Sequence, residues 1–139
     1  MSARSKARKR ALDILYQSDV RGVSPVDVLQ VEEGRRLERR EAELNPLVRE
    51  LVGGVSEHRV EIDEILATYS LGWTVERMAA VDRAALRIGV YEVIWADEVP
   101  DAVAISEAVA LVSDLSTDES PSFVNGLLSR ASEMKSLHR

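Results

Sequence analysis

Residues 80–96 constrain the fold more than any other segment, because they follow a helical pattern that leaves almost no polar face. Apolar side chains occupy nearly every side of the expected helix: Val81, Ala84, Ala85, Leu86, Ile88, Val90, Tyr91, Val93, Ile94 and Trp95. No apolar run in the chain approaches the roughly 18 residues that a membrane span requires. A helix of this kind belongs at the centre of a bundle. The sequence therefore predicts a helical protein built around this segment.

The remaining segments also have helical periodicity, and their boundaries have recognisable signals. Capping residues followed by proline predict three helix starts, at Ser24-Pro25, Asn45-Pro46 and Ser120-Pro121. Residues 32–43 are highly charged and weakly periodic, which fits either an exposed helix or a mobile linker. No segment pair has hairpin turn chemistry. We predict an all-α fold, a compact bundle of about seven helices. Gly72-Trp73-Thr74 is expected to divide it into subdomains 1–71 and 72–139.

The composition argues against most catalytic chemistry. The chain has no cysteine and two histidines, so thiolate nucleophiles, disulfides and zinc–cysteine sites are excluded. Gly53-Gly54 lacks the Lys-Ser/Thr that follows a phosphate-binding loop. His58 and Glu61 share a helix face, but no second such pair completes a carboxylate-bridged metal site. We therefore expect no enzyme activity, no metal and no cofactor, and a cytoplasmic protein.

The charge distribution along the chain is uneven. Lys and Arg number 18 against 24 Asp and Glu, yet five cations precede the first acid, Asp13. They are Arg4, Lys6, Arg8, Lys9 and Arg10. Without these five, 13 cations would face 24 acids, and the net charge would change from -6 to -11. Cations concentrated at one end favour a polyanionic partner such as RNA or DNA, although a solvated, frayed terminus would have the same composition. Tyr16, on about the same face, is expected either to stack on a base or to lie in the core.

Two further segments contain residues suited to recognition. The segment 116–126 contains Glu119, Ser120 and the only phenylalanine, Phe123, which fits a stacking platform for an unpaired base as well as core packing. Within the segment 80–96, Arg87 and Glu92 fit a structural charge network, because a buried charge needs a partner. Asp82 and Arg83, at the start of that helix, are better candidates for a partner-binding surface.

Four segments together resemble the NusB family of transcription antitermination factors over nearly the whole chain. They are Ala7-Arg8-Lys9-Arg10-Ala11-Leu12 with Leu15-Tyr16, Val81-Asp82-Arg83-Ala84 through Leu86-Arg87-Ile88-Gly89-Val90-Tyr91-Glu92, Val99-Pro100 with Val103-Ala104-Ile105-Ser106-Glu107-Ala108-Val109, and Phe123-Val124-Asn125-Gly126-Leu127-Leu128. Each is weakly specific alone. The four in this order and spacing are a strong resemblance.

The resemblance implies a NusB-like fold of two helical subdomains and a non-catalytic role. Members of the family bind boxA RNA of ribosomal RNA transcripts with the ribosomal protein NusE, in an antitermination complex on RNA polymerase. By position, the RNA-binding residues would be Arg4, Lys6, Arg8, Arg10, Tyr16, Glu119, Ser120 and Phe123. Asp82 would lie on the NusE side, with Arg83 beside it. The resemblance also implies that a homodimer can form. The alternatives are a protein-only helical scaffold or dimerisation module and a DNA-binding regulator.

Overall fold

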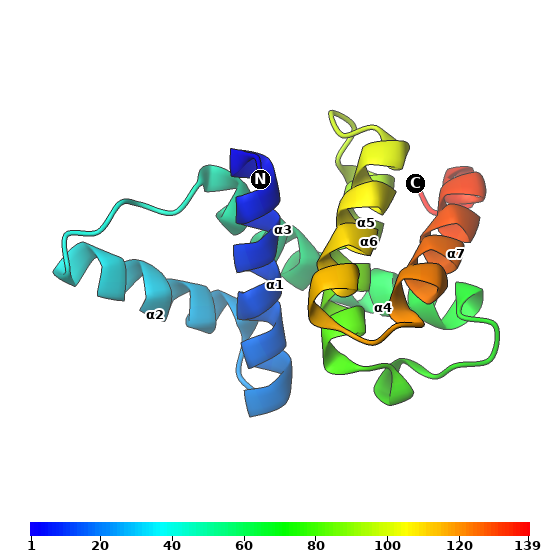
Figure 1. Ribbon diagram of the computed structural model, residues 1–139, viewed down its shortest axis with the longest axis horizontal. Coiled ribbons are helices and arrows are strands. Elements are labelled where there is room, and N and C mark those ends of the chain that lie inside the picture. Colours follow the sequence, from blue (N-terminus) through cyan, green and yellow to red (C-terminus); the bar gives the residue numbers. More distant parts are fainter. The chain divides into compact units, whose positions relative to one another are not determined.

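A computed structural model describes residues 1–139, and its regular secondary structure is entirely helical (Figure 1). Seven α-helices are joined by turns and two short 3₁₀ helices: α1 (Ala3–Arg21), α2 (Pro25–Glu38), α3 (Pro46–Glu57), α4 (Arg59–Tyr69), η1 (Val75–Arg77), α5 (Ala80–Trp95), α6 (Asp101–Leu115), α7 (Ser120–Glu133) and η2 (Lys135–Leu137). The predicted all-α fold of about seven helices is confirmed. None of these helices combines the length and the apolarity needed to cross a membrane.

The chain forms two compact units, residues 1–57 and residues 58–139. This division falls earlier than the predicted boundary between residues 71 and 72, because α4 packs against α5 and α7. An ion pair supports that packing. Asp63 of α4 accepts hydrogen bonds from Nε and Nη2 of the buried Arg87 in α5, at 3.0 and 3.2 Å. The break at Gly72 therefore lies inside the second unit, where its φ of 100° makes a turn.

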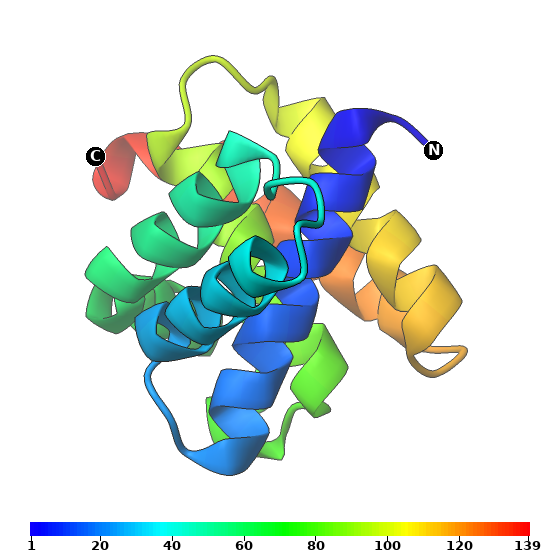
Figure 2. The same ribbon diagram turned by 90° about the vertical axis from the view of Figure 1, so that its left-hand side faces the viewer.

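The first unit consists of α1, α2 and α3 packed on one another. Ser2 caps α1, since its hydroxyl accepts a hydrogen bond from the Ser5 amide at 3.0 Å. Gly22 ends α1 in the left-handed conformation, with φ of 67°, and Figure 2 shows the turn from α1 into α2. The helix α2 buries little more than Val28 and Leu29. Its charged second half is an exposed helix as far as Glu38, and residues 39–45 follow as a loop.

The centre of the second unit is α5, which packs against α4, α6 and α7. Eleven of its 16 residues are buried, as the apolar pattern predicts. Gly89 lets α7 approach closely: a Cβ at this position would lie 2.6 Å from Cδ1 of Leu128. The C-terminal end is held by side chains, because Lys135 pairs with Asp101 at 2.9 Å and the Tyr69 hydroxyl contacts Nε2 of His138 at 2.7 Å. The core of this unit thus depends on close packing around α5.

The contact at Gly89 generates a prediction about stability. Replacing Gly89 with alanine should lower the free energy of unfolding by up to about 2 kcal/mol, because overpacking costs about 1–3 kcal/mol and the gain in helix propensity recovers about 1. Gly53→Ala is the matched control, since no atom lies within 4 Å of the added Cβ, and it should be neutral or stabilising. Urea unfolding followed by circular dichroism measures both. Equal stability of the two variants would contradict the packing argument.

A second prediction concerns Glu32 in α2. Two hydrogen bonds from Arg35, at 2.6 and 3.0 Å, lower the pKa of this carboxyl to about 2; desolvation opposes the shift and Arg36 supports it. Because the folded-state pKa is depressed, the stabilisation is present above the ordinary pKa of 4.5 and is lost as the pH falls towards 2. The group is largely solvated, so we expect less than about 1 kcal/mol.

Glu32→Gln should remove the loss of stability that protonation of Glu32 causes. Urea unfolding of the variant and of wild type between pH 4.5 and pH 2 measures the two free energies of unfolding. The exposed Glu38→Gln is the control, because no ion pair holds that carboxylate. An identical pH dependence for wild type and Glu32→Gln would refute the assignment.

Candidate nucleic-acid interface

The first candidate surface is the cationic part of α1. Arg4, Lys6, Lys9 and Arg10 are exposed, and the first turn of this helix contains no acidic residue. Arg8 is different: its side chain is 2% exposed and is engaged within the protein. It lies on the same face as the buried Ala7, Ala11 and Leu12. The exposed cations of α1 are therefore the other four, and the expected RNA contact of Arg8 stays a prediction that its burial does not favour.

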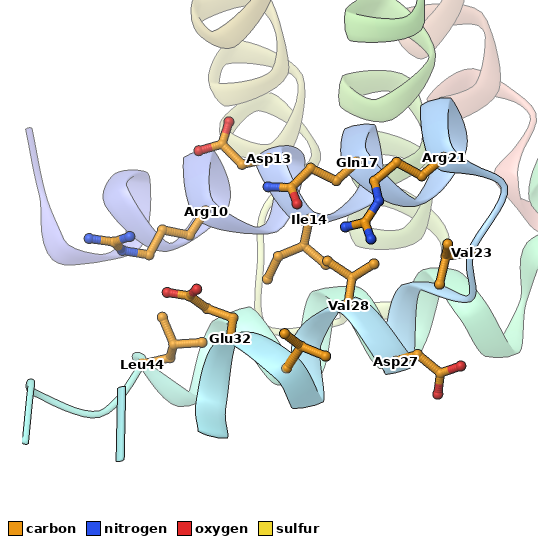
Figure 3. Close-up of a pocket in the computed structure, with 11 residues that line it drawn as sticks. Arg10, Asp13, Ile14, Gln17, Arg21, Val23, Asp27, Val28, Glu32 and Leu44 are labelled. Carbon is orange, nitrogen blue, oxygen red and sulfur yellow. The ribbon is translucent and has the colours of Figure 1, made fainter. Parts of the chain in front are cut away.

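Tyr16 lies on the outer side of α1 and is 38% exposed, which excludes the core alternative for this ring. Elsewhere in the first unit, α1 and α2 enclose a groove of about 260 Å³ that Tyr16 does not line (Figure 3). The groove has mixed charge, with Arg10 and Arg21 from α1 and with Asp13, Asp27 and Glu32 as the acids. Burial raises the pKa of Asp13, and the nearby Lys9 and Arg10 only partly oppose this. The groove is therefore not a continuation of the cationic surface.

The second candidate surface surrounds a cavity of about 310 Å³ in the second unit. It lies where η1, the start of α5 and the start of α7 come together, and its walls are mainly apolar. It is lined by Trp73, Arg77, Met78, Ala79, Asp82, Thr117, Glu119, Ser120 and Phe123. The structure thus brings together Asp82, Glu119, Ser120 and Phe123, which the sequence analysis names on two separate segments.

Asp82 and Ser120 form the buried floor of this cavity. The Ser120 hydroxyl donates a hydrogen bond to Oδ2 of Asp82 at 2.9 Å and lies 2.9 Å from the Thr117 hydroxyl. Asp82 is 7% exposed and Ser120 is 1% exposed. Oδ1 of Asp82 is buried and has no hydrogen-bond partner. The start of α5 is therefore not the open partner surface that we expect from its position in the sequence.

Arg83 supports the same cavity from outside. Its Nη1 donates hydrogen bonds to the carbonyl oxygens of Val75 and Met78 at 3.1 and 2.9 Å. These bonds hold η1 against the start of α5, so that Met78 and Trp73 form a wall. The guanidinium of Arg83 thus makes hydrogen bonds within the protein. This arrangement does not support the partner-binding role expected of Arg83.

Gly126 in α7 has a tertiary explanation. The guanidinium of Arg130 passes over it, and a Cβ at Gly126 would lie 3.1 Å from Nη1. Arg130 donates from Nε and Nη2 to the carbonyl oxygen of Tyr69 at 3.0 and 2.8 Å, at the end of α4. The glycine that weakens the helix locally therefore makes room for the link that fixes α7 on α4.

Sequence reasoning did not single out five residues of the cavity lining: Trp73, Arg77, Met78, Ala79 and Thr117. A signal for the first was present, since Trp73 is a large aromatic residue inside a turn and is 54% exposed. No group of three or more histidine or acidic side chains could hold a metal ion. His58 instead stacks on Trp95, with ring centroids 4.1 Å apart.

Comparison with known proteins gives a consistent assignment. The family model described as the NusB family matches residues 5–133. The transcription antitermination protein NusB of Nocardioides sp. (strain ATCC BAA-499 / JS614) is 59% identical over 128 residues, which cover 92% of each chain. That of Thermobifida fusca (strain YX) is 55% identical over 133 residues, covering 96% of this chain and 91% of the relative.

Solved structures agree with the sequence comparison. A structure of T. maritima NusB superimposes with a TM-score of 0.83 at 26% identity, over 96% of this chain and 92% of that chain. The match to the family model includes α1 from residue 5 onward and every residue that lines the cavity. By the family model and by these full-length relatives, the chain belongs to the NusB family.

Proposed function

We propose that this chain is a non-catalytic, RNA-binding transcription antitermination factor that binds boxA RNA of ribosomal RNA transcripts together with NusE. The observation that carries the proposal is the exposed cationic surface of α1 on a chain whose net charge is -6. Relatives named as transcription antitermination proteins support it. A match to a structure of antitermination factors NusB and NusE in complex with dsRNA also supports the proposal. The TM-score is 0.81 at 28% identity, over 96% of this chain and 98% of that chain.

Electrostatics gives the cationic surface its role in RNA capture. Arg4, Lys6, Lys9 and Arg10 lie within two turns of the N-terminal end of α1, where the helix dipole is already positive. Their mutual repulsion destabilises the free helix, and phosphate groups relieve it. Each phosphate contact releases counterions, so binding is strong at low salt and sequence-independent. The helix therefore captures and positions RNA, and other residues must select the sequence.

Aromatic side chains supply the selective contacts in this proposal. Tyr16 presents an exposed ring on α1, and Phe123 lies half-buried at the cavity. Unpaired bases stack on such rings in single-stranded RNA recognition. Docking of NusE would add surface and raise affinity, and the pair would act within the antitermination complex on RNA polymerase in the cytoplasm. A homodimer would interfere with RNA if it covered α1 or the cavity.

We predict that Phe123→Ala weakens boxA binding roughly 5- to 150-fold, because a base–aromatic stack is worth about 1–3 kcal/mol. Fluorescence anisotropy with labelled boxA RNA and a scrambled RNA, with and without NusE, measures this. Leu137→Ala is the matched control, since it truncates an exposed apolar side chain away from the cavity. Equal binding of both RNAs, unchanged by NusE, would refute the proposed function. NusE binding that persists after ribonuclease treatment, without any RNA binding, would favour the protein-only scaffold.

The salt dependence of boxA binding provides a separate prediction. Arg4→Gln should make the slope of log K against log salt shallower by about 0.7, because one phosphate contact to a single strand contributes about that much. Arg39→Gln is the matched control: it removes an exposed arginine of the same unit outside α1 and should leave the slope unchanged. Anisotropy titrations at four salt concentrations determine both slopes. Equal slopes for the two variants would exclude Arg4 from the phosphate contacts.

A further inference from the structure

We infer that the side-chain amine of Lys6 on α1 is an acylation site, at which an acyl phosphate removes one cation from the surface that captures RNA. The inference rests on the proposed function, because it concerns the regulation of that surface. It depends on the choice of lysine at this position, since an arginine guanidinium stays protonated and is not a target of acetylation. Acylation of Lys6 makes the binding of boxA RNA weaker and less dependent on salt.

The distribution of lysine along the chain is the first observation. Of the 18 cationic side chains, 15 are arginine and three are lysine: Lys6, Lys9 and Lys135. Two of the three lysines therefore lie among the four exposed cations of α1, in a helix of 19 residues. Arginine supplies every other cation outside α1 except Lys135. Acylation can thus change the charge of the RNA-capturing surface while leaving nearly all other cations of the chain unchanged.

The three amines differ in what surrounds them. Nζ of Lys135 pairs with Asp101 at 2.9 Å, so acylation there must first break an ion pair. Lys9 lies one helical turn before Asp13, and the two side chains attract each other. Lys6 is exposed, and no hydrogen bond or ion pair holds its side chain. Lys6 is therefore the lysine whose amine is most open to a reagent from solution.

A neighbouring cation brings the phosphate of the reagent to Lys6. Arg10 lies one turn after Lys6, and residues four apart are neighbours on a helix surface. Figure 3 shows the Arg10 side chain extending towards the N-terminal end of α1. A guanidinium binds phosphate through charge-assisted hydrogen bonds, which hold the acyl carbon near the amine. The first turn of α1 contains no acid to oppose this, whereas Asp13 repels the reagent beside Lys9.

The acyl transfer needs no reagent besides the acyl phosphate. The Lys6 amine, in its neutral form, attacks the carbonyl carbon with its nitrogen lone pair, and a C–N bond forms. The C–O bond to phosphorus oxygen breaks, inorganic phosphate leaves with the bonding electron pair, and the proton of the nitrogen passes to water. The product is an uncharged amide. The surface of α1 then keeps three exposed cations instead of four, so one phosphate contact of the RNA is lost.

The first measurement is the rate of acylation at each lysine. The full-length protein is incubated with acetyl phosphate, and peptide mass spectrometry quantifies the acetylated fraction of Lys6, Lys9 and Lys135 over time. Lys6 should react several-fold faster than Lys135, which is the control within the same chain. Arg10→Gln should slow the reaction at Lys6 and leave that at Lys135 unchanged. Arg39→Gln removes an exposed arginine of the same unit outside α1 and should slow neither.

The second measurement is boxA binding by anisotropy, with each protein compared with its own untreated sample. Treatment should make the slope of log K against log salt shallower for wild type than for Lys6→Arg, by about 0.7, because one phosphate contact to a single strand contributes about that much. Lys6→Arg keeps the charge but cannot be acylated at this position. Lys135→Arg is the matched control, since it removes the amine of the second unit and should respond to treatment as wild type does. Circular dichroism checks that treatment leaves the helices intact.

Three outcomes would overturn the inference. If boxA binds in preference to the scrambled RNA but Lys135 is acylated as fast as Lys6, the acylation site fails and the proposed function stands. If Lys6 is acylated first but treatment changes wild type and Lys6→Arg equally, acylation of Lys6 does not regulate RNA binding, and the proposed function again stands. If the untreated protein binds boxA and scrambled RNA equally, the proposed function fails, and its regulation through Lys6 fails with it.

Discussion

The burial of α5 on nearly every side is the constraint on which the second unit depends. A helix at the centre of a bundle brings its polar residues into the interior with its apolar ones, and each buried charge then needs a partner. Arg87 meets Asp63 of α4, and Asp82 meets the hydroxyl of Ser120 at the start of α7. These bonds connect α5 to α4 and to α7. The pair of Arg87 and Asp63 holds α4 in the second unit. The hydrogen bond from Ser120 to Asp82 forms the floor of the cavity.

The placement of α7 depends on two glycines as much as on its apolar stripe. Gly89 lets Leu128 approach the backbone of α5, and Gly126 lets Arg130 reach the carbonyl of Tyr69. A Cβ at Gly89 would require Leu128 to shift, and a Cβ at Gly126 would require a smaller displacement of the Arg130 guanidinium. Together with the hydrogen bond from Ser120, they fix the middle and the start of α7. Phe123 lies between these fixed points, so its ring is held at the cavity by packing elsewhere in the helix.

Sequence reasoning recovers features that depend on local pattern and misses those that depend on tertiary partners. The apolar run identifies α5 and the proline signals identify helix starts, because periodicity and capping are local. The boundary near residue 57 is missed because the apolar stripe continues from α3 into α4 across His58. Arg8 is expected to be exposed because a charge pattern does not reveal burial. The pairing of Asp82 with Ser120 joins residues 38 positions apart, and no local pattern contains it.

An acidic protein that binds RNA must limit where the polyanion approaches. The cationic part of α1 and the cavity of the second unit differ in the charges that they present to it. The net charge of -6 opposes a polyanion over the chain as a whole, whereas the exposed cations of α1 precede the first acid, Asp13, and attract phosphate there. The cavity is mainly apolar, and the two acids in its lining, Asp82 and Glu119, repel phosphate but can accept hydrogen bonds from donor groups. In the proposed complex, cations would therefore determine how tightly RNA is held. Stacking on the rings of Tyr16 and Phe123 would then supply the contacts to unpaired bases.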